Sequence, residues 1–264
     1  MKPAAFTAIV LTHDRTACVA RHMIARYAAV WPDHPFTFRI PYQRLSAVAD
    51  MPGCEYVPAP AGIKQTVETL LADLPDDEWI YWCLDDKYPI RIDVLRIASL
   101  VRALGDGGPA DVSGVLFCRA RRMLDEAFLT GQRLTLGGQL LLERLVYEQI
   151  WIHQFVRVKV VRHLVAAFPD VIKPAAVMDR LKRRVAKPAD HRLWVTAVNH
   201  SVFGESTRAG VLTENCLGSM RRQGMPIPDW QPAVAAPETI IGQLTPGDVV
   251  VGGDAPSDPE GAVE

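Results

Sequence analysis

Two adjacent aspartates, Asp85 and Asp86, follow the apolar run WIYWCL at residues 79–84 and precede Lys87. An apolar run of this length, bounded by charged residues, is typical of a buried strand. Both carboxylates then lie where the strand leaves the core, and they repel each other unless a cation or hydrogen-bond donors share them. Mg²⁺ and Mn²⁺ prefer carboxylate oxygens and bridge them to nucleotide phosphates. The doublet therefore predicts a site for Mn²⁺ or Mg²⁺, or alternatively a turn that the carboxylates merely cap.

A second polar group, Thr12 to Arg15, follows the first apolar segment of the chain, AFTAIVLT at residues 5–12. This segment is too short for a signal peptide and indicates a strand. In sheets built from parallel strands, ligands bind outside the carboxyl ends of the strands. We therefore predict that Thr12 to Arg15 and Asp85 to Lys87 lie at one edge of one sheet.

Strands and helices alternate through the first two-thirds of the chain. Helical spacing of apolar residues predicts helices over 16–31, from Gly62 and after Asp93. Further strands are predicted at PFTFRIPY (35–42), CEYVPAP (54–60) and VSGVLFCR (112–119). This rhythm predicts an α/β fold with a mainly parallel central sheet flanked by helices on both faces.

The later part of the chain has weaker patterns. RLTLGGQLLLE (133–143) indicates a strand pair or a bend, and YEQIWIHQF (147–155) a strand. A helix is predicted at 156–168, a strand at 193–198, and a short helix ending near residue 223. We expect one domain over 1–251, with a nucleotide-binding half at about 1–120 and a second half at about 121–251. The acidic segment 252–264, rich in Gly and Pro, predicts a disordered tail.

Composition excludes several classes of protein. With 49% apolar residues and a net charge of −1, the chain gives no reason to expect nucleic acid as a partner. Five cysteines without CxxC spacing favour reduced thiols, and no apolar segment approaches the roughly 20 residues of a membrane helix, so we expect a cytoplasmic protein without a transmembrane segment. GxxxxGK[ST], GxSxG and HExxH are absent, as is GxGxxG after the first strand. P-loop hydrolases, α/β hydrolases, zincin proteases and ordinary dinucleotide enzymes are therefore not favoured.

Over roughly residues 5–225 the chain resembles nucleotide-sugar-dependent glycosyltransferases with the GT-A fold. The likeness is carried by IVLTHDR, GIKQTVETLLADLPDDEWIYWCLDDKY, QIWIHQFVRVKVV and HSVFGESTRAGVLTENC. It implies that Thr12 and Arg15 lie beside the donor nucleoside, and that Asp85 and Asp86 match an acidic motif that binds metal and the donor diphosphate. That motif is usually Asp-x-Asp, so the adjacent aspartates are a departure, and Lys87 could itself hold a phosphate.

Four further residues are candidates for ligand binding. Lys64, at the start of the helix after Gly62, could contact the donor or lie in a solvated first turn. His200, in a late loop, could complete the metal shell or be a surface residue. Trp151 offers a flat apolar face to an acceptor sugar, and His153 is either an acceptor-site group or a core histidine.

The implied reaction transfers a glycosyl group from a nucleoside diphosphate sugar to a hydroxyl of a glycan or small-molecule acceptor. Its transition state has oxocarbenium character. An inverting enzyme needs a carboxylate base near the acceptor hydroxyl, whereas a retaining enzyme does not need it in the same way. Asp170, Asp179 and Glu205 are candidates for this base, and the sequence does not separate them.

Two other functions compete with this interpretation. A nucleotidyltransferase acting on sugar phosphates shares the alternating layout, but such enzymes tend to carry a glycine-rich loop after the first strand, where this chain has THDRTACVA. A non-catalytic, GT-A-like scaffold protein would need neither the aspartate doublet nor the polar end of the first strand for packing.

Overall fold

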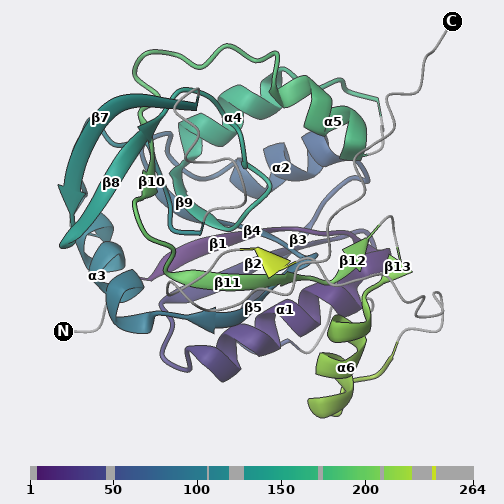
Figure 1. Cartoon of the computed structure of the whole chain (residues 1–264). Helices are drawn as coiled ribbons and strands as arrows, with labels where there is room; N and C mark the ends of the chain where they lie inside the picture. The colour runs from purple at the N-terminus through teal and green to yellow at the C-terminus, as the bar shows by residue number, and fades with distance from the viewer. Residues whose placement is uncertain are drawn as a thin grey trace, which may run out of the picture.

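The computed structural model describes residues 5–45, 51–105, 107–118, 128–171, 175–208, 211–227 and 240–241. Within these ranges a nine-stranded sheet has the order β3-β2-β1-β4-β9-β6-β10-β8-β7 (Figure 1). Its strands are β1 Phe6–Leu11, β2 Phe36–Tyr42, β3 Cys54–Pro58, β4 Trp79–Leu84, β6 Gly114–Leu116, β7 Leu129–Leu136, β8 Gln139–Arg144, β9 Gln154–Arg157 and β10 Leu193–Thr196. The pairs β3–β2, β2–β1, β1–β4 and β6–β10 are parallel. The other neighbours are antiparallel.

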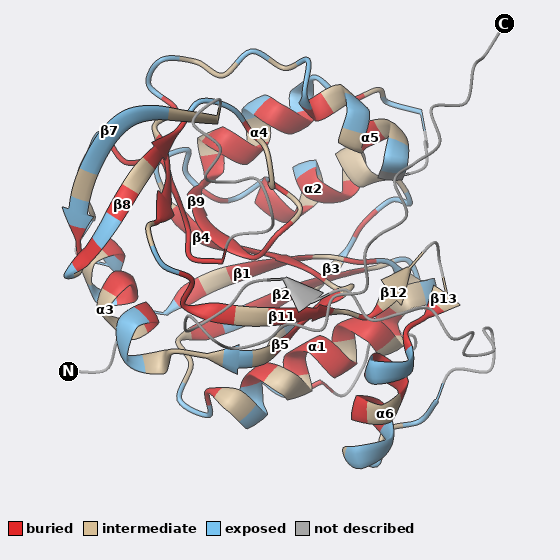
Figure 2. Ribbon diagram, viewed as in Figure 1, coloured by how far each residue is buried: buried red, intermediate tan, exposed pale blue. Residues whose placement is uncertain are grey.

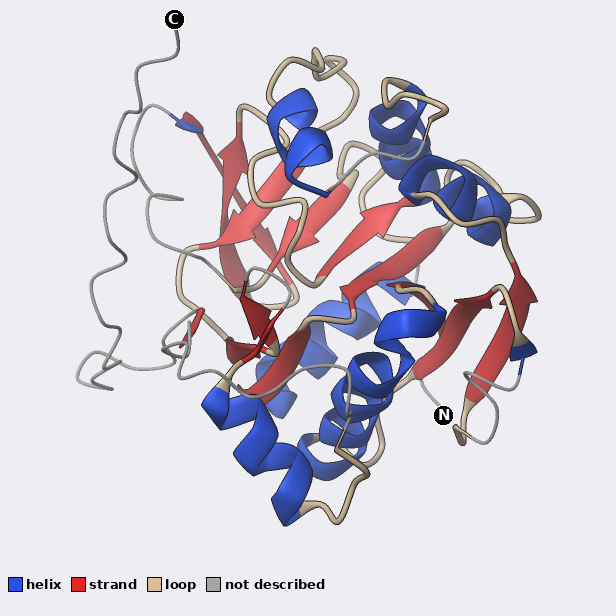
Figure 3. Cartoon of the chain, turned by 90° about the vertical axis from the view of Figure 1, so that its right-hand side faces the viewer, coloured by secondary structure: helices blue, strands red, loops and turns tan. Residues whose placement is uncertain are grey.

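Helices cover both faces of this sheet, as Figure 3 shows from the side. They are α1 Ala17–Val30, α2 Ile63–Leu71, α3 Val94–Gly105, α4 Val158–Ala166, α5 Ala175–Lys182 and α6 Glu214–Arg222, with a 3₁₀ turn η1 at Asp14–Thr16. In Figure 1, α2, α4 and α5 lie on one side of β1 to β4, and α1 and α6 on the other. None of the helices in the described part of the chain is long and apolar enough to cross a membrane.

Strand β4 shows why the central sheet is apolar on both faces. All six of its residues are buried (Figure 2). Because successive side chains of a strand point to opposite faces, Tyr81 and Cys83 pack into the core under α1, whereas Ile80 and Trp82 pack into the core under α2 and α4. A strand covered on both faces needs such a continuous apolar run, which is what makes residues 79–84 recognisable in the sequence.

A second sheet has the order β14-β11-β5. Its strand β5 follows β4 in the chain after Asp85 and Asp86. Its strands are β5 Lys87–Ile92, β11 Ser201–Glu205 and β14 Ile240–Ile241, and a separate pair joins β12 Thr207–Arg208 to β13 Val211–Leu212. Strands β11 and β5 are antiparallel, with Glu205 opposite Lys87 and Ser201 opposite Ile92. This pairing brings a late part of the chain back to the aspartate doublet.

The predicted fold class, an α/β chain with a central sheet flanked by helices, is confirmed. The segment 133–143 is part of a strand pair that turns at Gly137 and Gly138, both at positive φ. Of the strand predicted at 147–155, only 154–155 is strand, as the first half of β9. Strands β5 and β11 to β14 and helix α5 were not predicted. The predicted tail at 252–264 and the division near residue 120 fall outside the described residues.

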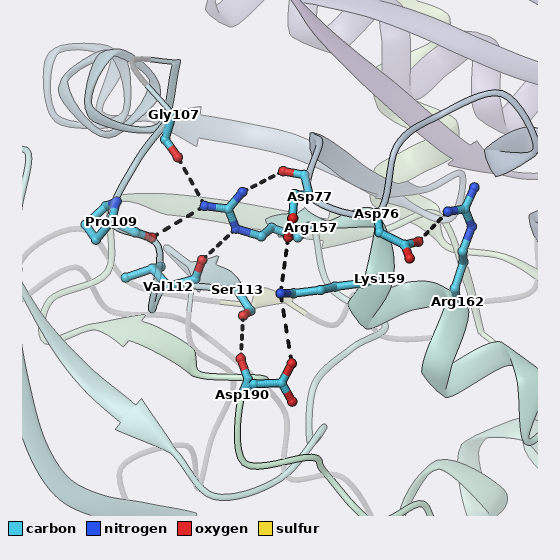
Figure 4. A network of polar contacts seen from close by, with 10 residues as sticks. All are labelled: Asp76, Asp77, Gly107, Pro109, Val112, Ser113, Arg157, Lys159, Arg162 and Asp190. Carbon is cyan, nitrogen blue, oxygen red and sulfur yellow. Dashed lines mark hydrogen bonds and ion pairs between the residues drawn. The ribbon is translucent and has the colours of Figure 1, made fainter.

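Arg157 connects the loop before β4 to the loop before β6 (Figure 4). Its guanidinium donates hydrogen bonds to four backbone carbonyls, those of Val112 (2.9 Å), Asp77 (2.5 Å), Gly107 (3.1 Å) and Pro109 (3.4 Å). It also lies 4.7 Å from the centre of the Trp79 ring. Burial lowers the pKa of Arg157, and the nearby Asp77 charge opposes that shift. The side chain therefore holds loops together through carbonyl oxygens.

We expect Arg157→Met to lower the free energy of unfolding by about 3 kcal/mol, because hydrogen bonds to a charged donor are lost and the carbonyls lose their partner. Urea unfolding measures this effect. Lys159→Met is a matched control, since Lys159 makes a more exposed ion pair with Asp77 at 3.2 Å. That control should cost less than about 1 kcal/mol. Equal losses in the two variants would contradict the role given to Arg157.

Candidate functional site

The carboxyl ends of β1 and β4 lie side by side. Leu11 pairs with Leu84, and the Asp85 N–H donates to the Leu11 carbonyl at 3.3 Å. The next residues therefore face each other, and the Thr12 hydroxyl donates to Asp85 Oδ2 at 2.7 Å. The structure thus brings together the two polar groups that the sequence placed at one edge of the sheet.

Asp85 is partly buried, and its carboxyl has hydrogen bonds with Thr12 and Thr16. Burial raises the pKa of its carboxyl to about 7, and the neighbouring Asp86 charge adds to the rise. Hydrogen bonds from Thr16 and Thr12, and the charge of Lys87, act in the opposite direction on this pKa. The Asp85 carboxyl therefore holds its proton up to about neutral pH.

This raised pKa makes stability depend on pH. The folded chain binds the Asp85 proton more tightly than an unfolded chain, whose carboxyl titrates near 3.8. The stability that this proton contributes is fully present below about pH 4 and is lost as the pH rises to about 7. We expect the free energy of unfolding of Asp85→Asn to exceed that of wild type by about 2 kcal/mol at about pH 8. This difference should shrink as the pH falls towards about 4. Urea unfolding at both pH values tests this, and a wild type at least as stable as the variant at the higher pH would contradict it.

Lys87 joins Asp86 to Glu205. Its ammonium lies 2.9 Å from Asp86 Oδ2 and 2.9 Å from Glu205 Oε1, and only 9% of the lysine side chain is exposed. Burial alone lowers the pKa of Lys87, but the Asp86 and Glu205 charges outweigh it and raise the pKa overall. The lysine therefore stays charged and holds the two carboxylates on either side of it.

The charges around this site do not balance. Asp85, Asp86 and Glu205 contribute three carboxylates and Lys87 one ammonium, a formal charge of −2 when all are ionised. In addition, Asp86 Oδ1 is buried and has no hydrogen-bond partner among the described residues. Mg²⁺ is commonly bound through one or two carboxylates, with waters and substrate phosphates completing its shell. Asp86 Oδ1 is an oxygen that could bind such an ion. No group of three or more His, Cys, Asp or Glu side chains in the described ranges is arranged to hold one.

His200 does not lie beside the aspartates. It precedes β11, its N–H donates to the Phe117 carbonyl at 2.9 Å, and its own carbonyl accepts from Asp93 at 2.8 Å. The β11–β5 register puts this end of β11 opposite Ile92, about 13 Å along the strand from Glu205. The prediction that His200 completes a metal shell with the doublet is therefore wrong, because an extended strand separates the two.

The two predicted acceptor residues differ in their surroundings. His153 has no exposed surface, and its ring nitrogens contact the Tyr27 hydroxyl at 2.7 Å and the Leu84 carbonyl at 2.9 Å. It is the core histidine of the two alternatives, and a direct contact with an acceptor is wrong for it. Trp151 is half-buried, with its ring 6.1 Å from that of Phe168, and its acceptor role stays a prediction.

Two of the three predicted bases are engaged elsewhere. Asp170 pairs with Lys64 at 2.7 Å, and the Gln65 side chain donates to the Asp170 carbonyl. Asp179 pairs with Lys182 at 2.7 Å within α5. Glu205 is thus the one of the three that the structure links to Asp86, through Lys87.

Arg15 lies on the exposed turn η1, where its N–H donates to His13 Nδ1 at 3.1 Å. The preceding residue, Asp14, links two strand ends that the sequence did not connect. The Asp14 N–H donates to Gln43 Oε1 at 3.2 Å, and the Gln43 N–H donates to Asp14 Oδ1 at 2.8 Å. Gln43 directly follows β2. The strand-end rule that selected Thr12 and Asp85 applied equally to Gln43.

Ser206 contacts the doublet but was not predicted as a site residue. Its N–H donates to the Asp86 carbonyl at 2.7 Å, and its side chain is buried. The residue follows Glu205 at the end of β11, so it reaches the doublet only through the strand pairing. Nothing in the sequence pattern indicated this contact.

No protein-family model matches the sequence, and no curated protein matches it. Among solved structures, the chain is similar to the galactosyltransferase LgtC in complex with donor and acceptor sugar analogs, with 12% identity, a TM-score of 0.36 and coverage of 70% of this chain and 68% of that chain. An active-site mutant of LgtC matches with 12% identity and a TM-score of 0.37, over 69% of this chain. This chain spans 66% of the length of that mutant, slightly less than two-thirds.

Proposed function

We propose that this chain is a glycosyltransferase that moves a sugar from a nucleoside diphosphate sugar to an acceptor hydroxyl. The observation that carries the proposal is the aspartate doublet at the adjoining carboxyl ends of β1 and β4, with a buried Asp86 oxygen that lacks a partner among the described residues. Ligands of open α/β sheets bind at this edge. A carboxylate pair held there suits a diphosphate bound through a cation.

Mn²⁺ or Mg²⁺ would be held by Asp86 and Asp85 and would neutralise the charge of the departing diphosphate. A direct contact between Lys87 and phosphate is less favourable, since its ammonium is already shared by Asp86 and Glu205. The net negative charge of these groups repels a diphosphate that arrives without a cation. Lys87 would instead hold Asp86 and Glu205 on either side of its ammonium.

The rest of the donor would extend along the strand ends. Thr12 and Arg15, which follow β1, would lie beside the nucleoside. Lys64, in the first turn of α2, would have to exchange its partner Asp170 for a phosphate oxygen, and Asp170 is largely exposed and free to release it. Trp151 would then offer its exposed face to the acceptor.

Glu205 is the carboxylate that would take the proton from the acceptor hydroxyl in an inverting reaction. It keeps 22% of its side chain exposed, and it is joined through Lys87 to the groups that would hold the diphosphate. A base must reach the hydroxyl that attacks the sugar, and this position is next to the donor site. Asp170 and Asp179 have other ionic partners and lack this link.

A screen of UDP-, GDP- and dTDP-sugars, with and without Mn²⁺, tests the proposal. We expect slow release of the nucleoside diphosphate from at least one donor, because water can replace the missing acceptor. The release should depend on the divalent cation. A chain that neither hydrolyses nor binds any of these donors would favour the scaffold alternative.

A further inference from the structure

A chain of buried hydrogen bonds runs from the core to the aspartate doublet. The Tyr81 and Tyr27 hydroxyls lie 2.6 Å apart, and the Tyr27 hydroxyl lies 2.7 Å from His153 Nδ1. On the other side of the ring, His153 Nε2 lies 2.9 Å from the carbonyl oxygen of Leu84, the residue before Asp85. All three side chains are at most 1% exposed. The chain of contacts therefore ends one residue from the proposed site.

The chemistry of the end group fixes the direction of every bond. A carbonyl oxygen only accepts, so His153 Nε2 carries a proton and donates to Leu84. Burial lowers the pKa of His153 to about 4, hence the ring is neutral at neutral pH and its Nδ1 has no proton. Tyr27 then donates to Nδ1, and Tyr81 donates to Tyr27. The Tyr27 hydroxyl thus donates to His153 and accepts from Tyr81, and the imidazole has one tautomer.

The position of His153 explains why this bond is needed. Strand β9 begins at Gln154 and pairs with β4 from Trp79 to Trp82, so the backbone ladder on that side stops before Leu84. Beyond the end of this ladder, the His153 imidazole donates a hydrogen bond to the Leu84 carbonyl. On the other side, the Asp85 N–H binds the Leu11 carbonyl at 3.3 Å. Both polar groups of the peptide unit between Leu84 and Asp85 are thereby held.

We propose that His153 is a positioning residue, oriented by Tyr27, which fixes the Leu84–Asp85 peptide so that the aspartate doublet is preorganised for a cation and a diphosphate. The part of this proposal that concerns the ligand rests on the proposed function. The part that concerns the position of the doublet does not, because it follows from the hydrogen bonds alone. Preorganised donors and carboxylates lose less freedom on binding, which strengthens binding without a new contact.

The test compares three variants that each remove a buried polar group. Tyr27→Phe removes the hydroxyl that orients His153, and His153→Phe removes the donor to Leu84. Tyr147→Phe is the matched control, since the Tyr147 hydroxyl lies 2.8 Å from His191 Nδ1 in a different buried tyrosine–histidine pair. Melting temperature is recorded for all three, so that a general loss of stability is measured separately.

Two readouts follow the doublet itself. Hydrogen exchange of the Asp85 and Asp86 amides, measured by NMR, should become about tenfold faster in Tyr27→Phe and His153→Phe but not in Tyr147→Phe. The affinity for UDP or GDP with Mn²⁺, measured by calorimetry, should fall about tenfold in the same two variants. Unchanged exchange in both variants, or unchanged affinity alongside faster exchange, would overturn the positioning role. Faster exchange in a chain whose wild type binds no nucleotide would support the positioning of the doublet and reject the proposed function.

Discussion

Asp86→Asn is expected to reduce the turnover of a nucleoside diphosphate sugar by about 10²- to 10³-fold, the loss typical of removing one electrostatic stabiliser of a leaving group. The substitution keeps the shape of the side chain but removes the charge that would bind the cation. It also replaces one of the two oxygens by an amide group, which does not bind a metal ion. Initial rates of diphosphate release at saturating Mn²⁺ measure the effect.

The matched control for this experiment is Asp76→Asn. Asp76 precedes β4 at the opposite edge of the sheet and pairs with Arg162 (Figure 4). Its loss should leave turnover within about twofold of wild type, because a surface ion pair contributes little and lies away from the site. Similar rates for Asp86→Asn, Asp76→Asn and wild type would reject Asp86 as part of the donor site.

Lys87→Met is expected to lower the free energy of unfolding by about 3 kcal/mol, because removing one partner of a buried ion pair leaves its charge uncompensated. Here two carboxylates, Asp86 and Glu205, lose the ammonium that lies 2.9 Å from each. Both carboxylates keep part of their surface exposed, which limits the loss. Urea unfolding in the absence of divalent cations measures the change.

Adding Mn²⁺ then separates this explanation from a simple packing defect. A cation bound by the carboxylates would replace the missing positive charge, so Mn²⁺ should stabilise Lys87→Met more than it stabilises wild type. Lys159→Met, whose ion pairs are more exposed, should show neither the large loss nor the extra gain. An Mn²⁺ effect of the same size in Lys87→Met and wild type would contradict the charge balance described for the site.

The position of Thr12 and Asp85 at one edge of the sheet could be predicted because it depends on local patterns. Residues 79–84 form a continuous apolar run, and residues 5–12 form another, so each strand and its end are visible in the sequence. Parallel strands end at the same edge of a sheet. That β1 and β4 are neighbours, so that Thr12 contacts Asp85, comes from the structure. The same rule would have found Gln43 after β2, had it been applied to every strand.

The link between Lys87 and Glu205 could not be predicted in this way. It depends on the antiparallel register of β5 and β11, whose paired residues are far apart in the sequence, and β5 itself carries too little alternation to be recognised as a strand. The register decides that Glu205 faces Lys87 and that His200 lies at the far end of β11. A one-residue shift of the register would turn the side chains of β11 to the other face of the sheet, and no local pattern fixes this register.

The role of His153, a buried polar residue, could not be predicted from the sequence. Its partner Tyr27 is 126 residues away in the sequence, and a histidine between apolar residues fits a core position as well as a site. Only the packing of α1 against the sheet decides between the two. The sequence therefore left His153 as either an acceptor-site group or a core histidine, and the structure places it in the core.

Calorimetric titration of UDP and GDP into the wild-type chain and Asp86→Asn, each with and without Mn²⁺, tests the central claim most directly. The account predicts that the wild type binds at least one nucleoside diphosphate, that binding requires Mn²⁺, and that Asp86→Asn loses it. Binding of equal strength by both proteins without Mn²⁺, or no binding by the wild type under any of these conditions, would contradict it.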